Sequence, residues 1–454
     1  MQVNPGIFKA YDIRGIYPTE LNEEAAYLIG RAFVSFLGAH TVIVGRDMRL
    51  SGPSMFEAVT RGITDQGADV ADIGMVSTDQ YYFACAELGL PGMMVTASHN
   101  PKQYSGFKMV RRMPYLLSGD EGIQDLRRLV ESEAFPTPTR TGKITRHDFQ
   151  EPFIQKVLSL IDIAALQARA EQGAPLRVIA DTGNGMVGPI LQAIYARLPI
   201  HFEGMYLDPD GNLPNHGLDP LQPENRAELQ ARVPAEGYDI GFLFDGDGDR
   251  FFAVDDRGQF ISGDFLTAIM GQYMLEKYPS ARILYDVRAS WAVPDLISAA
   301  GGTPLMERVG HAFIKRRMAT EDAVFAGEVT GHYYFKEFFY ADSGIIPSLI
   351  LMELLAKRGT RMSALLAELE ARYFISGEIN SRVADVQGRL EALAAHYRDG
   401  AIERLDGISV RYDTWHFNVR GSNTEPLIRL NLESIASPDE MAARRDEVLA
   451  IIRA

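Results

Sequence analysis

Apolar runs rich in β-branched residues alternate with amphipathic stretches up to residue 370. A short apolar run that stops at a polar or glycine-rich loop predicts a buried strand, and an apolar repeat that follows the turn of a helix predicts a helix. The order strand, helix, strand predicts sheets with parallel strands covered by helices. Predicted helices lie at residues 186–198 and 265–278, and predicted strands with the loops that follow them lie at residues 40–47, 176–185, 239–250, 281–290 and 323–332.

The pattern changes after residue 370. Residues 383–398 have the repeat of a helix, and residues 408–420 and 427–434 have that of strands. A final helix is predicted to begin after Ser437, because Glu440 at the third helical position completes a capping box. This order predicts a small α+β domain.

We therefore predict an α/β protein with three related α/β domains, each with a mixed sheet, and a C-terminal α+β domain. Ligands of such sheets gather at the loops beyond the carboxyl ends of the strands, so these loops are expected to line one central cleft. The predicted domains are residues 1–145, 146–256, 257–370 and 371–454.

The composition fits an ordinary globular protein with several cores, since 46% of the 454 residues are hydrophobic and 23% are charged. The net charge of −15 argues against binding to nucleic acid or to an anionic membrane. An anionic substrate would have to be bound by local positive clusters.

Three further features bear on the cellular compartment. The single cysteine, Cys85, lies in an apolar segment and is expected to be a buried, inert thiol. The N-terminus lacks the basic and apolar segments of a signal peptide. The apolar stretch 345–356 is shorter than the roughly 20 residues of a membrane span. We expect a cytoplasmic protein, with monomer and dimer equally open.

The first candidate for chemistry is Ser98 in the stretch TASHNP, which follows an apolar run. His99 is the obvious base, but adjacent side chains at the end of a strand point to opposite faces, so we expect His99 to be poorly placed to activate Ser98. The sequence around Ser98 also lacks the G-x-S-x-G pattern of a nucleophile elbow. A hydrolase triad is therefore disfavoured.

The second candidate is the loop DGDGDR, which directly follows the apolar run IGFLF. Asp245, Asp247 and Asp249 alternate with glycines that allow a tight turn, so three carboxylates can converge on one cation. An EF-hand is rejected, because Arg250 stands at the sixth position, where that loop needs glycine. The sequence predicts a site for Mg²⁺, whose remaining ligands would be hard oxygens such as those of a phosphate.

Two further loops have the composition of binding sites. The loop RGSNTEP offers a guanidinium, hydroxyls and an amide, which suit a phosphate. The loop GEVTGH offers a carboxylate, a hydroxyl and an imidazole, which suit sugar hydroxyls. Smaller signals come from residues in other predicted loops, namely Tyr11, Arg14, Lys108, Arg288, His311 and Arg429.

Taken together, AYDIRG, TASHNP, DGDGDR, GEVTGH and RGSNTEP resemble the motifs of the α-D-phosphohexomutase family in order and approximate spacing. The resemblance covers essentially the whole chain and is greatest to the bacterial phosphomannomutase/phosphoglucomutase branch. It implies four domains around a cleft. These would bear a phosphoserine loop (domain I), a metal-binding loop (domain II), a sugar-recognition loop (domain III) and a phosphate-binding loop (domain IV).

The resemblance implies an enzyme that interconverts hexose 6-phosphate and hexose 1-phosphate, with mannose and glucose as the sugars. Ser98 would carry the phosphoryl group and, with the three aspartates, bind one Mg²⁺; hexose 1,6-bisphosphate would be intermediate and activator. The implied catalytic residues are Ser98, Lys108, Arg250, His311, Arg14 and Tyr11. The implied substrate-binding residues are Glu328, Thr330, His332, Arg288, Arg420, Ser422, Asn423, Thr424 and Arg429.

Two departures from the family pattern lie at positions that could tune substrate preference. Val329 and Thr330 stand where Met-Ser is frequent, and Arg288 stands where a lysine is familiar. A phosphoglucosamine mutase of the same family is the nearest alternative, followed by a sugar phosphatase with a phosphoenzyme. His311 and Lys108 are both candidates for the general acid/base.

Overall fold

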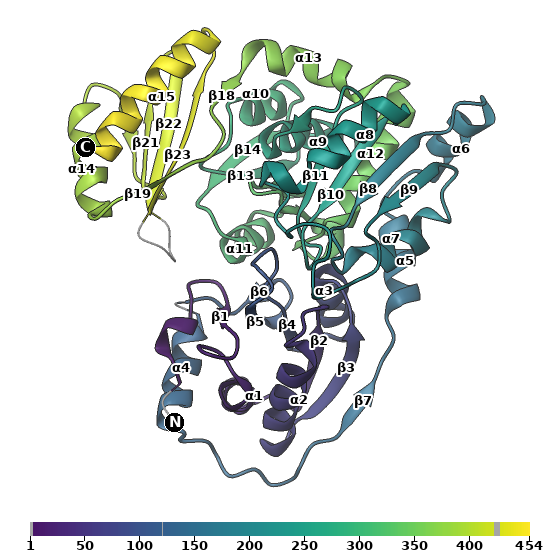
Figure 1. The fold of residues 1–454 in the computed structure, drawn as a ribbon, viewed down its shortest axis with the longest axis vertical. Helices are drawn as coiled ribbons and strands as arrows, with labels where there is room; N and C mark the ends of the chain where they lie inside the picture. Colours follow the sequence, from purple (N-terminus) through teal and green to yellow (C-terminus); the bar gives the residue numbers. More distant parts are fainter. Residues whose placement is uncertain (1–2, 120, 422–426) are drawn as a thin grey trace. The chain divides into compact units, whose positions relative to one another are not determined.

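The computed structural model describes residues 3–119, 121–421 and 427–454 (Figure 1). The chain divides into two compact units. The first unit comprises Met1–Ile261 and Thr330–Met362, and the second comprises Ser262–Val329 and Ser363–Ala454.

The N-terminal sheet of the first unit has the strand order β1-β5-β4-β2-β3-β7, with β6 paired to β5. Strands β2, β3, β4 and β7 are parallel, whereas β5 runs antiparallel to β4 and β1. Helices α1 and α2 pack against each other beside this sheet (Figure 1). The elements are η1 (Pro5–Ile7), β1 (Ile13–Ile16), α1 (Glu23–Leu37), β2 (Thr41–Arg46), α2 (Gly52–Asp65), β3 (Asp69–Met75), α3 (Thr78–Leu88), β4 (Gly92–Val95), β5 (Tyr104–Arg112), β6 (Tyr115–Leu116), α4 (Ile123–Ser132) and β7 (Ile144–Arg146).

The second sheet of this unit has the order β12-β11-β10-β8-β9. Strands β8, β9 and β10 are parallel, and β11 returns antiparallel to β10. All five residues of β10 are buried, as its uninterrupted apolar sequence predicts. The elements are α5 (Gln150–Leu158), α6 (Ile163–Glu171), β8 (Arg177–Asp181), α7 (Val187–Tyr195), β9 (His201–Met205), η2 (Pro223–Asn225), α8 (Ala227–Glu236), β10 (Ile240–Phe244), β11 (Phe251–Val254) and β12 (Phe260–Ile261).

A later segment of the chain completes the first unit. It contains β16 (Tyr333–Phe335), η3 (Lys336–Phe338), β17 (Ala341–Asp342) and α12 (Ile345–Arg358). Phe338 from this segment stacks on Phe83 of α3, with the ring centroids 6.4 Å apart. Phe153 of α5 meets the edge of Phe83 at 5.7 Å. One aromatic cluster thus joins three separate segments of the chain.

The second unit contains three parallel strands, with β13 between β14 and β15. Its other sheet is antiparallel, in the order β18-β23-β22-β21-β20, with β19 also paired to β23. The elements are α9 (Gly263–Lys277), β13 (Arg282–Asp286), α10 (Ala292–Ala299), β14 (Thr303–Glu307), α11 (His311–Glu321), β15 (Phe325–Gly327), α13 (Met362–Arg372), β18 (Phe374–Ile375), β19 (Ile379–Arg382), α14 (Val386–His396), β20 (Ala401–Glu403), β21 (Ile408–Arg411), β22 (Trp415–Gly421), β23 (Leu427–Ser434) and α15 (Pro438–Arg453).

The predicted fold class is confirmed, since mixed α/β sheets precede a C-terminal α+β sheet. The hydroxyl of Ser437 accepts a hydrogen bond of 3.0 Å from Glu440 N, so the predicted cap of the last helix is confirmed. Cys85 is buried, as expected. The four domain boundaries stay a prediction. Among the described residues, no helix combines the length and apolar character that crossing a bilayer requires.

Truncation of the aromatic cluster should destabilise the first unit. Phe83 is 2% exposed and contacts rings from two other segments. We expect Phe83→Ala to lower the free energy of unfolding by about 3–5 kcal/mol, because it removes buried apolar area and leaves a cavity. Urea unfolding followed by far-UV circular dichroism measures this change.

Tyr115→Ala is the control, because Tyr115 is 43% exposed. It should change the free energy of unfolding by no more than about 0.5 kcal/mol. Equal effects of the two substitutions would contradict a role for the Phe83 cluster in joining the segments.

Candidate functional site

Ser98 lies in the loop after β4 and has a left-handed backbone, with φ of 48°. Few residues other than glycine adopt this conformation, and its occurrence in a buried loop is a sign of a functional constraint. The Ser98 hydroxyl donates a hydrogen bond of 2.6 Å to Asp245 Oδ2. The structure therefore brings the first and second candidate motifs into direct contact.

The expectation that His99 points away from Ser98 is wrong. Ser98 Oγ lies 3.2 Å from His99 Nδ1. The prediction assumed an extended strand end, whereas the left-handed backbone of Ser98 turns both side chains to the same side. Burial, together with the charges of Arg250 and Arg14, holds the pKa of His99 well below its usual range, so its imidazole is neutral.

The aspartate loop follows β10, and all three of its carboxylates are buried. Asp245, Asp247 and Asp249 each offer an oxygen within 4.8 Å of the others. Gly248 has φ of 81°, which an L-residue rarely adopts. A Cβ on Gly246 would lie 2.7 Å from Ser98 O, so only glycine permits the close approach of the two loops.

The negative charge of this loop is partly balanced by Lys108 of β5. The ammonium of Lys108 lies 2.7 Å from Asp247 Oδ2 and also contacts Asp249. Burial alone would lower the pKa of Lys108, but the neighbouring aspartates outweigh it and raise this pKa. Lys108 is therefore a fixed cation. Burial and the charges of Asp247 and Asp249 raise the pKa of Asp245.

The aspartates fit a hard divalent cation. Asp247 Oδ1 is buried and has no hydrogen-bond partner among the described residues, so it is free to coordinate. Its other oxygen accepts hydrogen bonds of 2.6 Å from Thr78 Oγ1 and 3.2 Å from Thr96 Oγ1, which orient the carboxylate. Carboxylate and hydroxyl oxygens are the ligands that Mg²⁺ prefers.

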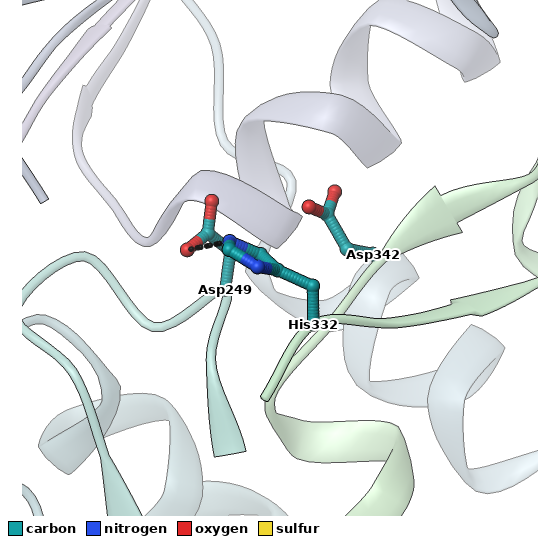
Figure 2. Close-up of side chains that lie close together, drawn as sticks. All are labelled: Asp249, His332 and Asp342. Atoms are coloured by element: carbon teal, nitrogen blue, oxygen red, sulfur yellow. Dashed lines mark ion pairs between the residues drawn. The ribbon is translucent and has the colours of Figure 1, made fainter. Parts of the chain in front are cut away.

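Asp249 also belongs to a second group of possible ligands, with His332 and Asp342 (Figure 2). His332 precedes β16, and its Nε2 lies 3.5 Å from Asp249 Oδ1. Burial would raise the pKa of Asp249, but Lys108 and His332 outweigh it and hold this pKa well below its usual range. Of the two groups, the three aspartates fit a hard cation better, because such an ion favours carboxylates over a set that includes an imidazole.

The first unit also contains other residues that the sequence analysis predicted for the site. Arg14 on β1 donates to Asn100, two residues beyond Ser98, and to Asp12. The backbone N–H of Arg250 donates to Asp245 Oδ1 over 3.2 Å. Thr330 Oγ1 lies 3.4 Å from His332 Nδ1. Tyr11, between η1 and β1, is half-buried.

The second unit holds a separate group of predicted residues around Arg288. This guanidinium is fully buried and pairs with Asp286 through two hydrogen bonds of 2.9 and 2.8 Å. It also lies 3.7 Å from Glu328 Oε2. The carboxylate of Glu328 thus lies close to the charge of Arg288, whose own role in substrate binding stays a prediction.

Glu378, which the sequence analysis missed, joins this group to the residues near the predicted phosphate loop. Its carboxylate lies 3.2 Å from Arg288 Nη1 and 3.1 Å from Arg429 Nη1. Arg420 is buried, and burial together with the charge of Arg288 lowers its pKa. Of the predicted phosphate-loop residues, Ser422, Asn423 and Thr424 lie outside the described residues.

His311 is the first residue of α11, in the second unit. Its role as a catalytic residue stays a prediction. Sequence reasoning also missed Thr78, Thr96 and Arg49, all of which are buried. Only Thr96 directly follows an apolar strand, β4, and that position was the available signal for it.

The chain matches four models of the phosphoglucomutase/phosphomannomutase family: alpha/beta/alpha domain I over residues 5–137, domain II over 151–258, domain III over 262–373 and the C-terminal domain over 378–451.

Two relatives are called phosphomannomutase, one from Salmonella montevideo and one from Escherichia coli strain K12. Each is 41% identical over 98% of this chain and 98% of the relative. A crystal structure of a phosphoglucomutase/phosphomannomutase family protein from Burkholderia thailandensis is 34% identical. It covers 99% of this chain and 97% of its own, with a TM-score of 0.89. The chain therefore belongs to the phosphoglucomutase/phosphomannomutase family.

Proposed function

We propose that the protein is a phosphohexomutase that interconverts hexose 6-phosphate and hexose 1-phosphate, with Ser98 as the phosphoryl carrier. One observation supports this role above all, the hydrogen bond of 2.6 Å from the buried Ser98 hydroxyl to Asp245. This hydrogen bond places the hydroxyl of the candidate carrier next to three carboxylates that could bind a divalent cation. Full-length relatives called phosphomannomutase support the same reaction.

The reaction consists of two transfers. In the first, the bond between phosphorus and Ser98 Oγ breaks, a bond from phosphorus to the free sugar hydroxyl forms, and the hydroxyl proton passes to a base. The hexose 1,6-bisphosphate then turns end for end. In the second transfer, the other phosphoryl group returns to Ser98 Oγ and its sugar oxygen takes up a proton.

The residues of the chain have separate tasks in these transfers. Lys108, held as a cation, stabilises the negative charge that develops on the transferring group, as does Arg250. Because Lys108 is held protonated, His311 is the better candidate for the base. Mg²⁺, bound by the three aspartates and the phosphorylated Ser98, would supply electrostatic stabilisation of the phosphoryl group.

The sugar is bound, in our proposal, by residues of the second unit. Glu328 would accept hydrogen bonds from the hydroxyls on C3 and C4. Thr330 and His332 are further proposed substrate-binding residues. Arg420, Arg429 and the loop with Ser422, Asn423 and Thr424 would bind the distal phosphate. Glucose and mannose differ at C2, which Glu328 would not contact, so both sugars are proposed substrates. Hexose 1,6-bisphosphate is the proposed activator.

Removal of the carrier should abolish turnover. We expect Ser98→Ala to lower kcat by at least about a thousandfold, because no other group can hold the phosphoryl between the two transfers. The assay follows mannose 1-phosphate and glucose 1-phosphate after priming with glucose 1,6-bisphosphate. Glucosamine 6-phosphate and released inorganic phosphate are measured alongside, since they would reveal an aminosugar mutase or a phosphatase.

Ser54→Ala is the matched control, because Ser54 is a half-buried serine whose hydroxyl bonds to Ser51 O and lies near Tyr17. It should leave kcat within about threefold. Full turnover by Ser98→Ala would refute the proposed carrier.

Lys108 should compete with the cation. Its ammonium contacts two of the three aspartates, so its positive charge repels a metal cation bound by the same carboxylates. We expect Lys108→Met to tighten the binding of Mn²⁺ roughly tenfold while lowering kcat about a hundredfold. Isothermal titration of dephosphorylated protein with Mn²⁺ measures the first effect.

Lys102→Met provides the comparison, since Lys102 is an exposed lysine of the neighbouring loop. Its Mn²⁺ affinity should match that of the wild type. Weaker Mn²⁺ binding by Lys108→Met would contradict the proposal that Lys108 and the metal ion compete for the three aspartates.

A further inference from the structure

Arg49 lies in the loop after β2, is 3% exposed, and spreads its guanidinium across the backbone of the Ser98 loop. Its Nη2 donates hydrogen bonds of 2.6 Å to Ser98 O and 2.7 Å to Asn100 O. Its Nη1 donates bonds of 2.9 Å to Pro101 O and 3.1 Å to Tyr104 O. One side chain therefore satisfies four carbonyls of a single loop.

Arg49 is itself fixed by Asp47. Its Nε donates to Asp47 Oδ2 over 3.1 Å, and its backbone N–H donates to Asp47 Oδ1 over 3.0 Å. The backbone N–H of Asp47 donates in turn to Val95 O, over 2.9 Å, at the end of β4. The guanidinium is thus anchored to the strand from which the Ser98 loop departs.

The loop requires such a partner. Because Ser98 is left-handed, its carbonyl and that of Asn100 turn towards Arg49, and buried carbonyls need donors. A planar guanidinium offers five N–H groups in a fixed fork, whereas a lysine offers one compact ammonium that cannot span four acceptors. The identity of residue 49 as arginine therefore matters.

The geometry points to Arg49 as a positioning residue for phosphoryl transfer, which fixes the backbone of residues 98–104 so that Ser98 Oγ faces Asp245. Its contacts are backbone carbonyls and Asp47, so it acts through Ser98. The kinetic consequence rests on the proposed function, whereas the ordering of the loop does not.

Arg226 provides a matched control elsewhere in the first unit. Its Nη1 donates hydrogen bonds of 3.0 Å to the carbonyls of both Pro220 and Leu221, so it also holds a loop through its backbone. Arg226→Lys removes the guanidinium from a loop that is separate from the Ser98 loop.

Hydrogen–deuterium exchange tests the loop directly. In Arg49→Lys, amides of residues 96–104 should exchange at least about tenfold faster than in the wild type, with those of residues 219–226 unchanged. Arg226→Lys should show the reverse. Unchanged exchange at residues 96–104 in Arg49→Lys would overturn the proposal.

Asp47→Asn replaces Arg49→Lys if that variant fails to fold, because it removes the carboxylate oxygen that accepts from Arg49 Nε. It should show the same increase in exchange at residues 96–104. No increase there would overturn the proposal.

Kinetics test the consequence for transfer. In Arg49→Lys, kcat should fall roughly a hundredfold with KM within about threefold, because the carrier is displaced while sugar binding is retained. Arg226→Lys should keep both constants within about threefold. A KM that rises as much as kcat falls would contradict positioning of Ser98. A wild type without mutase activity would refute the proposed function, while the exchange result would still decide the role of Arg49 in the loop.

Discussion

Three carboxylates in one buried loop repel one another, and this repulsion is the constraint on which the rest of the site depends. Asp245, Asp247 and Asp249 are all at most 2% exposed. Lys108 neutralises part of the charge, and hydroxyls orient one of the carboxylates. The negative charge that remains suits a divalent cation, and the three carboxylates could bind one. A phosphoryl group placed beside that cation would be held by charge and positioned for transfer, which is the basis of the proposed reaction.

The second requirement is a carrier that reaches the carboxylates. Ser98, the proposed carrier, would meet it through its left-handed backbone, which is unfavourable for serine and persists only where surrounding contacts impose it. Glycine at position 246 lets the two loops approach, and the guanidinium of Arg49 holds the carbonyls of the serine loop. The same backbone explains the contact with His99, whose neutral imidazole lies beside the hydroxyl instead of facing away.

The sequence predicts those parts of this arrangement that depend on local patterns. The uninterrupted apolar run before DGDGDR predicts a buried strand, and β10 is one, with the aspartates directly after it. The cap at Ser437 and the strand at residues 427–434 are likewise local and were predicted correctly. Contacts between residues that are far apart in the sequence could not be predicted from such local patterns. Arg49, Glu378 and Thr78 act through partners far along the chain, and the orientation of His99 depends on a backbone dihedral that no residue pattern signals for serine.

The location of the phosphoryl group tests the central claim most directly. The protein is incubated with glucose 1,6-bisphosphate, digested, and mapped by tandem mass spectrometry, then a second sample is treated with excess glucose 6-phosphate before mapping. The account predicts one phosphorylated residue, Ser98, whose phosphoryl group is lost to the sugar without release of inorganic phosphate. A phosphoryl group on another residue, or its release as inorganic phosphate, would contradict the account.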